Sequence, residues 1–159
     1  MNIVVGVSDM KLSNDPDSVL FTYSLGSCIG VSIYDPVVHV GGLLHFMLPE
    51  SSLDPSKAQK NPFMFADTGI PALFQATSHL GAVKKRMKVF VVGGGQVLDQ
   101  NESFNIGKRN HMAVRKMFSE NGVIADYEDV GGTVNRTIKL IIRNGEVWVK
   151  VSGQDYRKV

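Results

Sequence analysis

Short apolar runs, several alternating with polar residues, dominate the first half of the chain and predict β-strands. The runs are rich in Val, Ile, Tyr and Phe and are bounded by Gly, Pro or Asp, which is typical of strands. They are Ile3–Val7, Val19–Tyr23, Cys28–Tyr34 and Val40–Met47. From Leu48 to Pro62 the chain is rich in Ser, Asp, Pro and Lys and has no period, so we expect a loop there.

The second half alternates predicted helices and strands. Apolar residues at helical spacing predict one helix over Phe63–His79 and another from about Gly107 to Glu120. Pro71 conflicts with the first helix, so we expect a kink or a helix that begins near Pro71. Further strands are expected at Lys88–Val92 and Val123–Val130.

A hairpin is predicted near the C-terminus, because Asn144-Gly145 favours a two-residue type I′ turn. Such a turn would place Ile142 opposite Val147, Leu140 opposite Val149, and Ile138 opposite Val151 in the two paired strands. All three apolar pairs fall on one face of the sheet. Strands outnumber helices and hairpins join most neighbours, so we predict an α+β fold of mainly antiparallel sheet with two helices packed against it.

Composition restricts the class of protein. A chain of 159 residues is expected to form one domain, and its 43% hydrophobic and 20% charged content is ordinary for a globular protein. No apolar run is long enough to span a membrane, and the N-terminal residues do not resemble a signal peptide. The single cysteine cannot form an internal disulfide, which favours a reducing, cytoplasmic setting. A net charge of +2 is too small to indicate nucleic-acid binding.

Cys28 and His45 form the most informative pair in the chain. Asp35-Pro36 is a turn signal, and a hairpin centred between Pro36 and Val37 would place Cys28 directly opposite His45. Opposed residues share a sheet face, so a thiol and the imidazole that could activate it would meet. The alternative is that Cys28 is a small buried side chain of the core.

Other candidate motifs are weaker. Gly93-Gly94-Gly95 lacks the third glycine of a dinucleotide-binding loop, because position 98 is Leu, so we expect these glycines to permit close backbone approach. The remaining histidines are scattered and no metal-binding spacing occurs in the sequence, so neither a metal nor a cofactor is expected. A third group could orient His45, but spacing alone does not choose Thr22 over Ser24, Ser27 or Ser32.

Taken together, several segments resemble the CheD family of chemoreceptor glutamine deamidases. The matching segments are Thr22, Gly26-Ser27-Cys28, Asp35-Pro36, Gly41 with His45-Phe46-Met47-Leu48-Pro49, Ala66-Asp67-Thr68, Gly93-Gly94, Asn105-Ile106-Gly107-Lys108-Arg109-Asn110, and Gly131-Gly132 with Arg136. The resemblance implies that Cys28, His45 and Thr22 are catalytic. Tyr23-Ser24 and Phe65 depart from the residues common in the family.

The resemblance also implies a fold and partners. The family fold is two packed β-sheets flanked by two or three helices, similar to the cysteine hydrolase core of cytotoxic necrotizing factors. The implied substrate is a glutamine on the cytoplasmic helices of a chemoreceptor. The alternative function is a binding module that docks on and stimulates a CheC-type response-regulator phosphatase. A third possibility, a redox-sensing cysteine, would require a low thiol pKa.

Overall fold

The computed structural model describes residues 1–96 and 105–159. Its strands are β1 (Asn2–Val4), β2 (Asp9–Ser13), β3 (Val19–Leu25), β4 (Ile29–Asp35), β5 (Val40–Phe46), β6 (Lys88–Gly93), β7 (Tyr127–Val130), β8 (Arg136–Ile141), β9 (Val147–Val151) and β10 (Arg157–Lys158). Its helices are α1 (Pro55–Lys60), α2 (Ala66–His79) and α3 (Ile106–Asn121). None of the helices in these two ranges is long and apolar enough to cross a membrane.

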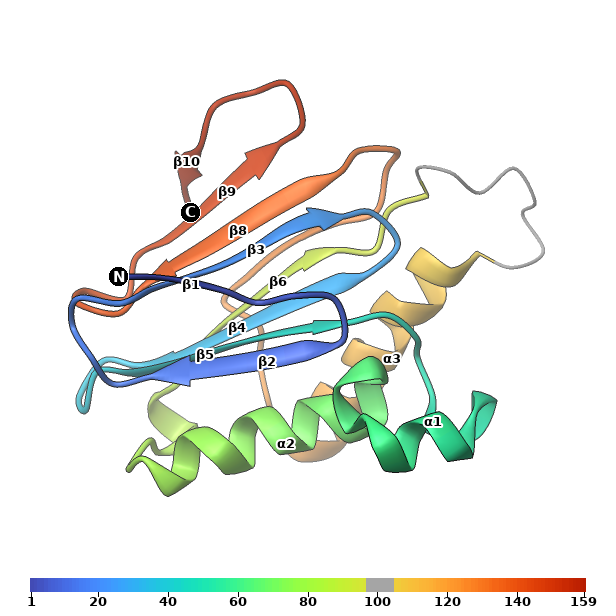
Figure 1. The fold of residues 1–159 in the computed structure, drawn as a ribbon, viewed down its shortest axis with the longest axis horizontal. Coiled ribbons are helices and arrows are strands. Elements are labelled where there is room, and N and C mark those ends of the chain that lie inside the picture. Colours follow the sequence, from blue (N-terminus) through green and yellow to red (C-terminus); the bar gives the residue numbers. More distant parts are fainter. Residues whose placement is uncertain (97–104) are drawn as a thin grey trace.

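The strands form two five-stranded sheets. The first has the order β1-β3-β8-β9-β10 and the second the order β2-β5-β4-β6-β7. Within the described residues the pairs are antiparallel except for β1–β3 and β6–β7. The helices lie together on one side of the two sheets (Figure 1). This arrangement confirms the predicted α+β class.

The second sheet is the middle layer of the molecule. One apolar core, which includes Leu20 and Leu43, joins the two sheets, and another, which includes Val31, Leu73 and Val114, joins the second sheet to α2 and α3. Consequently β4 and β5 are buried at every position. Burial on both faces explains why these two strands have few polar residues in the sequence.

The two long helices lie close to their predicted positions. α2 begins at Ala66 and contains Pro71 in its second turn, so the expectation of a start near Pro71 is wrong. A proline so near the N-terminus of a helix removes only one hydrogen bond, which packing of the apolar face can offset. The predicted loop before it contains the short helix α1. The Asp54 side chain caps the N-terminus of this helix by accepting a hydrogen bond from the backbone N–H of Lys57.

The C-terminal hairpin differs from the predicted register by two residues. Leu140 pairs with Val147 and Ile138 with Val149, so the strands are joined by four residues beyond Ile141 rather than by a two-residue turn. Gly145 takes the left-handed conformation at the end of that loop, with φ of 76°. A shift of two residues keeps every side chain on its predicted face.

Other strand predictions were incomplete. β2 and β10 were not expected, β1 is shorter than Ile3–Val7, and β7 is shorter than Val123–Val130. β7 starts late because the carboxylate of Asp126, just before it, accepts a hydrogen bond of 2.7 Å from the backbone N–H of Val89. That contact fixes the chain at the edge of β6 before regular pairing begins.

Candidate active site

His45 lies near the end of β5, at the buried interface between the two sheets. Gly30 of β4 is directly opposite His45, and Asp9 of β2 is opposite it on the other side. A Cβ at Gly30 would lie 3.0 Å from Leu25 and 3.5 Å from Thr22, so this face is turned toward the first sheet. Because opposed residues share a face, His45 also points between the sheets, and it is only 1% exposed.

Thr22 of β3 fixes the protonation state of the imidazole. Its Oγ1 lies 2.7 Å from His45 Nδ1 and donates a hydrogen bond to the Val5 carbonyl at 2.8 Å. A hydroxyl has a single hydrogen, which the Val5 carbonyl takes, so Thr22 accepts from Nδ1–H. The neutral ring therefore carries its hydrogen on Nδ1 and a lone pair on Nε2. A general base requires this tautomer.

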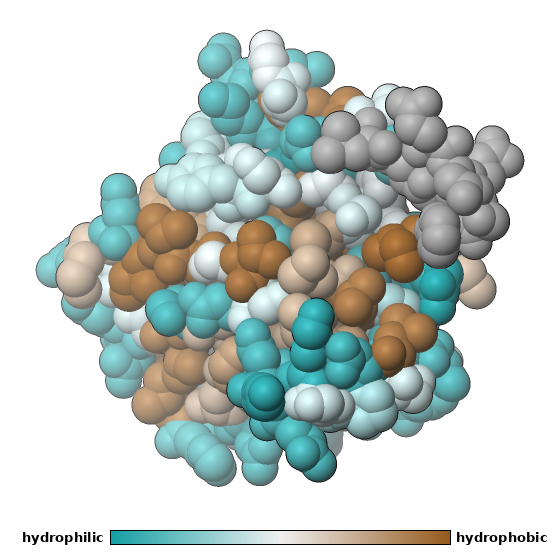
Figure 2. Space-filling view, turned by 45° about the vertical axis from the view of Figure 1, so that its right-hand side comes forward, coloured by the Kyte–Doolittle hydropathy of each residue, from teal (hydrophilic) through white to brown (hydrophobic). Residues whose placement is uncertain are grey.

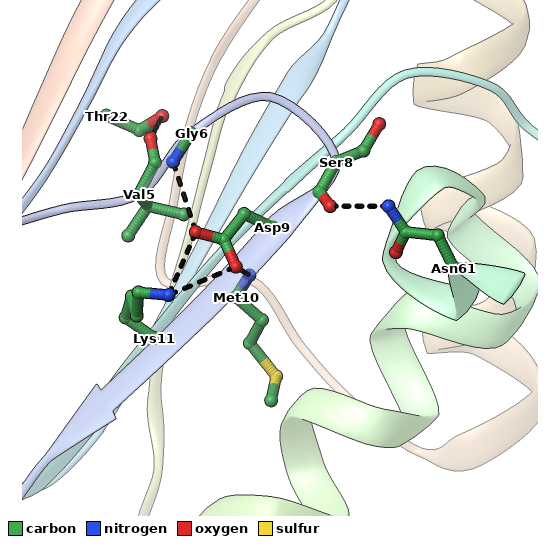
Figure 3. Close-up of polar contacts among 8 residues, drawn as sticks. All are labelled: Val5, Gly6, Ser8, Asp9, Met10, Lys11, Thr22 and Asn61. Carbon is green, nitrogen blue, oxygen red and sulfur yellow. Dashed lines mark hydrogen bonds and ion pairs between the residues drawn. The ribbon is translucent and has the colours of Figure 1, made fainter.

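The Val5 carbonyl belongs to the segment that crosses from β1 to β2. Figure 3 shows Thr22 beside Val5, with the Asp9 carboxylate next to them. That carboxylate accepts from Gly6 N–H at 3.3 Å and pairs with the Lys11 ammonium at 3.2 Å, which holds the crossing segment in place. The acceptor of the Thr22 hydroxyl is therefore fixed by the fold.

Burial sets the charge of His45. Removal from water lowers the pKa of His45 from 6.5 to about 4, while the nearby negative charge of Asp9 acts in the opposite direction. The ring is thus neutral near pH 7. Its Nε2 is buried and has no hydrogen-bond partner within residues 1–96 and 105–159. An imidazole nitrogen in this state can accept a proton from a group that reaches it.

Cys28 occupies the loop between β3 and β4, and its side chain is half-buried at the edge of the core between the sheets. The glycine run after β6 holds this loop: Gly94 N–H donates to the Cys28 carbonyl at 2.9 Å and Gly95 N–H to the Gly26 carbonyl at 2.7 Å. A Cβ at Gly93 would lie 2.3 Å from the Cys28 carbonyl oxygen. The close backbone approach predicted for these glycines is confirmed.

The predicted direct opposition of Cys28 and His45 is wrong. The hairpin contains four loop residues, Pro36–His39, with His39 in the left-handed conformation, and this moves the register by two. Cys28 lies just before β4 and is a diagonal neighbour of His45. Diagonal neighbours are still close enough for longer side chains to interact. No hydrogen bond joins the two in the described residues, and catalytic contacts are often long before substrate binds.

Burial also sets the state of the sulfur. It raises the pKa of the Cys28 thiol above its ordinary value, and the backbone N–H of Cys28, which lies against its own sulfur, partly offsets this. The resting pair is therefore a thiol and a neutral imidazole. A raised thiol pKa argues against a redox-sensing cysteine, which needs a thiolate at neutral pH.

One residue of the site was not predicted. Asn110 of α3 is completely buried, and its Nδ2 donates to the Ser27 carbonyl at 2.9 Å and to the Met47 carbonyl at 2.8 Å. These carbonyls adjoin the loop of Cys28 and the strand of His45. The signals in the sequence are a polar residue on the apolar face of a predicted helix and its place in the segment from Asn105 to Asn110 that resembles the CheD family.

Comparison with known proteins supplies the functional context. Residues 47–151 match the family model described as CheD chemotactic sensory transduction. The chain is 53% identical over 158 residues to the "Probable chemoreceptor glutamine deamidase CheD 1" of Syntrophus aciditrophicus, and the match covers 99% of each chain. It is 46% identical over 152 residues to the "Probable chemoreceptor glutamine deamidase CheD" of Solibacter usitatus, covering 96% of this chain and 90% of that protein.

Proposed function

We propose, since this chain belongs to the CheD family, that it is a cytoplasmic, cysteine-dependent hydrolase that converts specific glutamine side chains of chemoreceptors to glutamate. The relatives named above carry this reaction and substrate in their names. The observation that carries the proposal is the Thr22–His45 contact, which leaves a buried imidazole nitrogen available as a base. We further propose that residues 1–159 act as a single domain.

Cys28 is the nucleophile and His45 the general base. When the carboxamide of a receptor glutamine enters, the Cys28 sulfur attacks its carbon while His45 Nε2 takes the thiol proton. Because burial favours the neutral forms of both groups, the proton moves during the attack and no thiolate is stored beforehand. The Thr22 hydroxyl keeps Nδ1–H hydrogen-bonded throughout, so the ring stays in its orientation.

The tetrahedral intermediate needs hydrogen-bond donors near its oxygen. We assign this role to the backbone N–H of Cys28, which belongs to the same residue as the attacking sulfur. The protonated His45 then gives its proton to the leaving nitrogen, and ammonia departs to leave a thioester on Cys28. Water activated by His45 hydrolyses the thioester to glutamate and the free thiol. The receptor gains one negative charge, and charge change at a site is a common means of biasing a signalling protein.

Apolar side chains are exposed at the end of the molecule that carries the loop of Cys28. Figure 2 looks toward the end of the molecule where the chain passes from β3 to β4, and it shows separate apolar patches among polar residues. Val7 belongs to the same crossing segment as Val5 and is 58% exposed. Exposed apolar side chains can bind the apolar face of an incoming helix.

A defined receptor fragment tests the proposal. Mass spectrometry after incubation with the wild-type protein should show the mass change from a side-chain amide to an acid at glutamine, with release of ammonia. His45→Ala should abolish the change, because the variant lacks the ring nitrogen that takes the proton of the Cys28 thiol. His79→Ala, which removes an exposed imidazole at the end of α2, is the matched control and should retain activity. Equal activity in the two variants would refute the role of His45.

The family also implies a partner. We propose that a CheC-type phosphatase binds this protein, and that binding does not require the sulfur. Pull-down with Cys28→Ala protein should therefore recover the phosphatase as efficiently as wild type. A Cys28→Ala protein that fails to bind while remaining folded would show that the two roles are not separable in this way.

A further inference from the structure

Asn110 lies at the point where the pairing of β4 and β5 stops. The last pair of that ladder is Ile29 with Phe46, one residue short of Cys28 on one strand and of Met47 on the other. Beyond it the two backbones separate, and Met47 N–H donates to the Met64 carbonyl. The ladder therefore holds His45 through its pairing with Gly30, but it ends before Cys28.

The Asn110 amide spans this gap. Nδ2 has two hydrogens, and the two acceptors are the Ser27 carbonyl at 2.9 Å and the Met47 carbonyl at 2.8 Å. Because both neighbours are carbonyls, the nitrogen and not the oxygen must face them. Oδ1 is buried without a partner within the described residues, which costs free energy that an apolar side chain would avoid. The balance favours a role for the two donated hydrogen bonds over simple filling of space.

The helix that presents Asn110 is held rigidly against the cysteine loop. Gly107 lies one turn earlier on the same face of α3, and a Cβ there would be 2.2 Å from the Gly95 carbonyl oxygen. Gly95 in turn donates to the Gly26 carbonyl in the cysteine loop. The contact between α3 and the loop is therefore set by direct backbone packing, and Asn110 cannot move away without moving the helix.

The direction of the Ser27 carbonyl decides where the next N–H points. The Ser27–Cys28 peptide is trans, so its carbonyl and the N–H of Cys28 point in opposite directions. With the carbonyl bound to Asn110, the N–H of Cys28 is directed away from the Asn110 amide. The same hydrogen bond thus sets the direction of the backbone N–H of the nucleophile residue.

We propose that Asn110 is a positioning residue of the deamidase, holding the Ser27 and Met47 carbonyls together so that the Cys28 sulfur, its N–H and His45 keep their catalytic arrangement. This inference rests on the proposed function. Asn110 does not touch substrate in this role. It acts through the backbone on which the reacting groups are carried.

Two variants test the role. Asn110→Leu has nearly the same shape but no donor, and it should lower kcat about 10²–10³-fold, the effect of losing one oxyanion donor, while KM for a receptor fragment changes little. Asn110→Asp should behave similarly at neutral pH, because an ionised carboxylate repels both carbonyls. Its activity relative to wild type at the same pH should rise as pH falls and the acid gains a hydrogen to donate, because protonation of His45 lowers the activity of both proteins alike.

Thr77→Val is the matched control. Thr77 is also completely buried on a helix, but within the described part of the chain its hydroxyl donates only to the Leu73 and Phe74 carbonyls of α2 itself. This variant should lose thermal stability and keep wild-type kcat, with all rates measured where circular dichroism shows native protein. A folded Asn110→Leu or Asn110→Asp variant with wild-type kcat would overturn the inference, and Asn110→Asp decides if Asn110→Leu does not fold.

A separate readout distinguishes the inference from the proposed function. If wild type and Thr77→Val both release no ammonia, the proposed function fails. The positioning role is then decided by the amide resonance of Cys28 in the nuclear magnetic resonance spectrum. That resonance should shift in Asn110→Asp and stay in place in Thr77→Val. An unchanged resonance in both variants would contradict the positioning role whatever the activity.

Discussion

Replacing Thr22 by valine removes one hydroxyl and preserves the shape of the side chain. Thr22 is completely buried and His45 is 1% exposed, so water cannot replace the lost contacts. The Val5 carbonyl and the His45 Nδ1–H would each lose a buried partner, at about 1–3 kcal/mol apiece, so the free energy of unfolding should fall by about 2–6 kcal/mol.

The catalytic effect should exceed what instability explains. Without an acceptor at Nδ1, the ring can place its hydrogen on Nε2, where no lone pair then remains to take the Cys28 proton. Turnover should fall about 10²–10⁴-fold, the usual contribution of a general base. Thr22→Ser keeps the hydroxyl and loses only a methyl group, so it should lose about 1 kcal/mol of stability and retain most of the activity.

Three measurements separate these effects. Ammonia release at saturating receptor fragment gives kcat, urea denaturation gives stability, and the nitrogen chemical shifts of His45 give the tautomer. The shifts should report Nδ1–H in wild type and Thr22→Ser and a changed population in Thr22→Val. If folded Thr22→Val turns over as fast as Thr22→Ser, the hydroxyl does not orient the base.

Three further predictions concern charge, pH and packing. The negative charge of Asp9 raises the pKa of His45, and Lys11 neutralises part of that charge. Asp9→Asn should therefore move the acid limb of the pH–rate profile to lower pH, and Lys11→Gln should move it to higher pH. Shifts of the two variants in the same direction would contradict this explanation. The pKa of His45 is about 4 in the folded protein and 6.5 ordinarily, so the free energy of unfolding should fall by up to about 3 kcal/mol as pH falls from 6.5 to 4. Urea denaturation at several pH values should show a steeper dependence of this free energy on pH in wild type than in His45→Gln. Gly93→Ala should lower both melting temperature and kcat, because its Cβ would meet the Cys28 carbonyl, whereas Gly153→Ala, also left-handed but in open space, should lower melting temperature alone.

The hydrophobic pattern predicted sheet faces better than it predicted registers. Both hairpins have four-residue loops where shorter turns were expected, and both registers moved by two residues. An even shift preserves which face each side chain occupies, so Cys28 was placed on the correct face although not opposite His45. Loop length depends on a single left-handed residue in each case, His39 and Gly145, and the pattern of apolar positions does not encode it.

Contacts between layers could not be derived from local sequence. The Thr22–His45 hydrogen bond joins strands of different sheets, and the sequence left several hydroxyl side chains equally eligible until the family resemblance selected Thr22. The contact between Asn110 and Ser27 joins residues 83 positions apart. Such contacts follow from how the sheets and α3 pack, and periodicity reports only which face of an element is buried.

The central claim is that the Cys28 sulfur attacks a receptor glutamine. The most direct test is ammonia release from a receptor fragment by wild-type and Cys28→Ala proteins matched for concentration and for circular dichroism spectrum. Release should be complete with wild type and at the background rate with Cys28→Ala. Release by Cys28→Ala at the wild-type rate would contradict the mechanism, because no second cysteine exists in this chain to replace the sulfur.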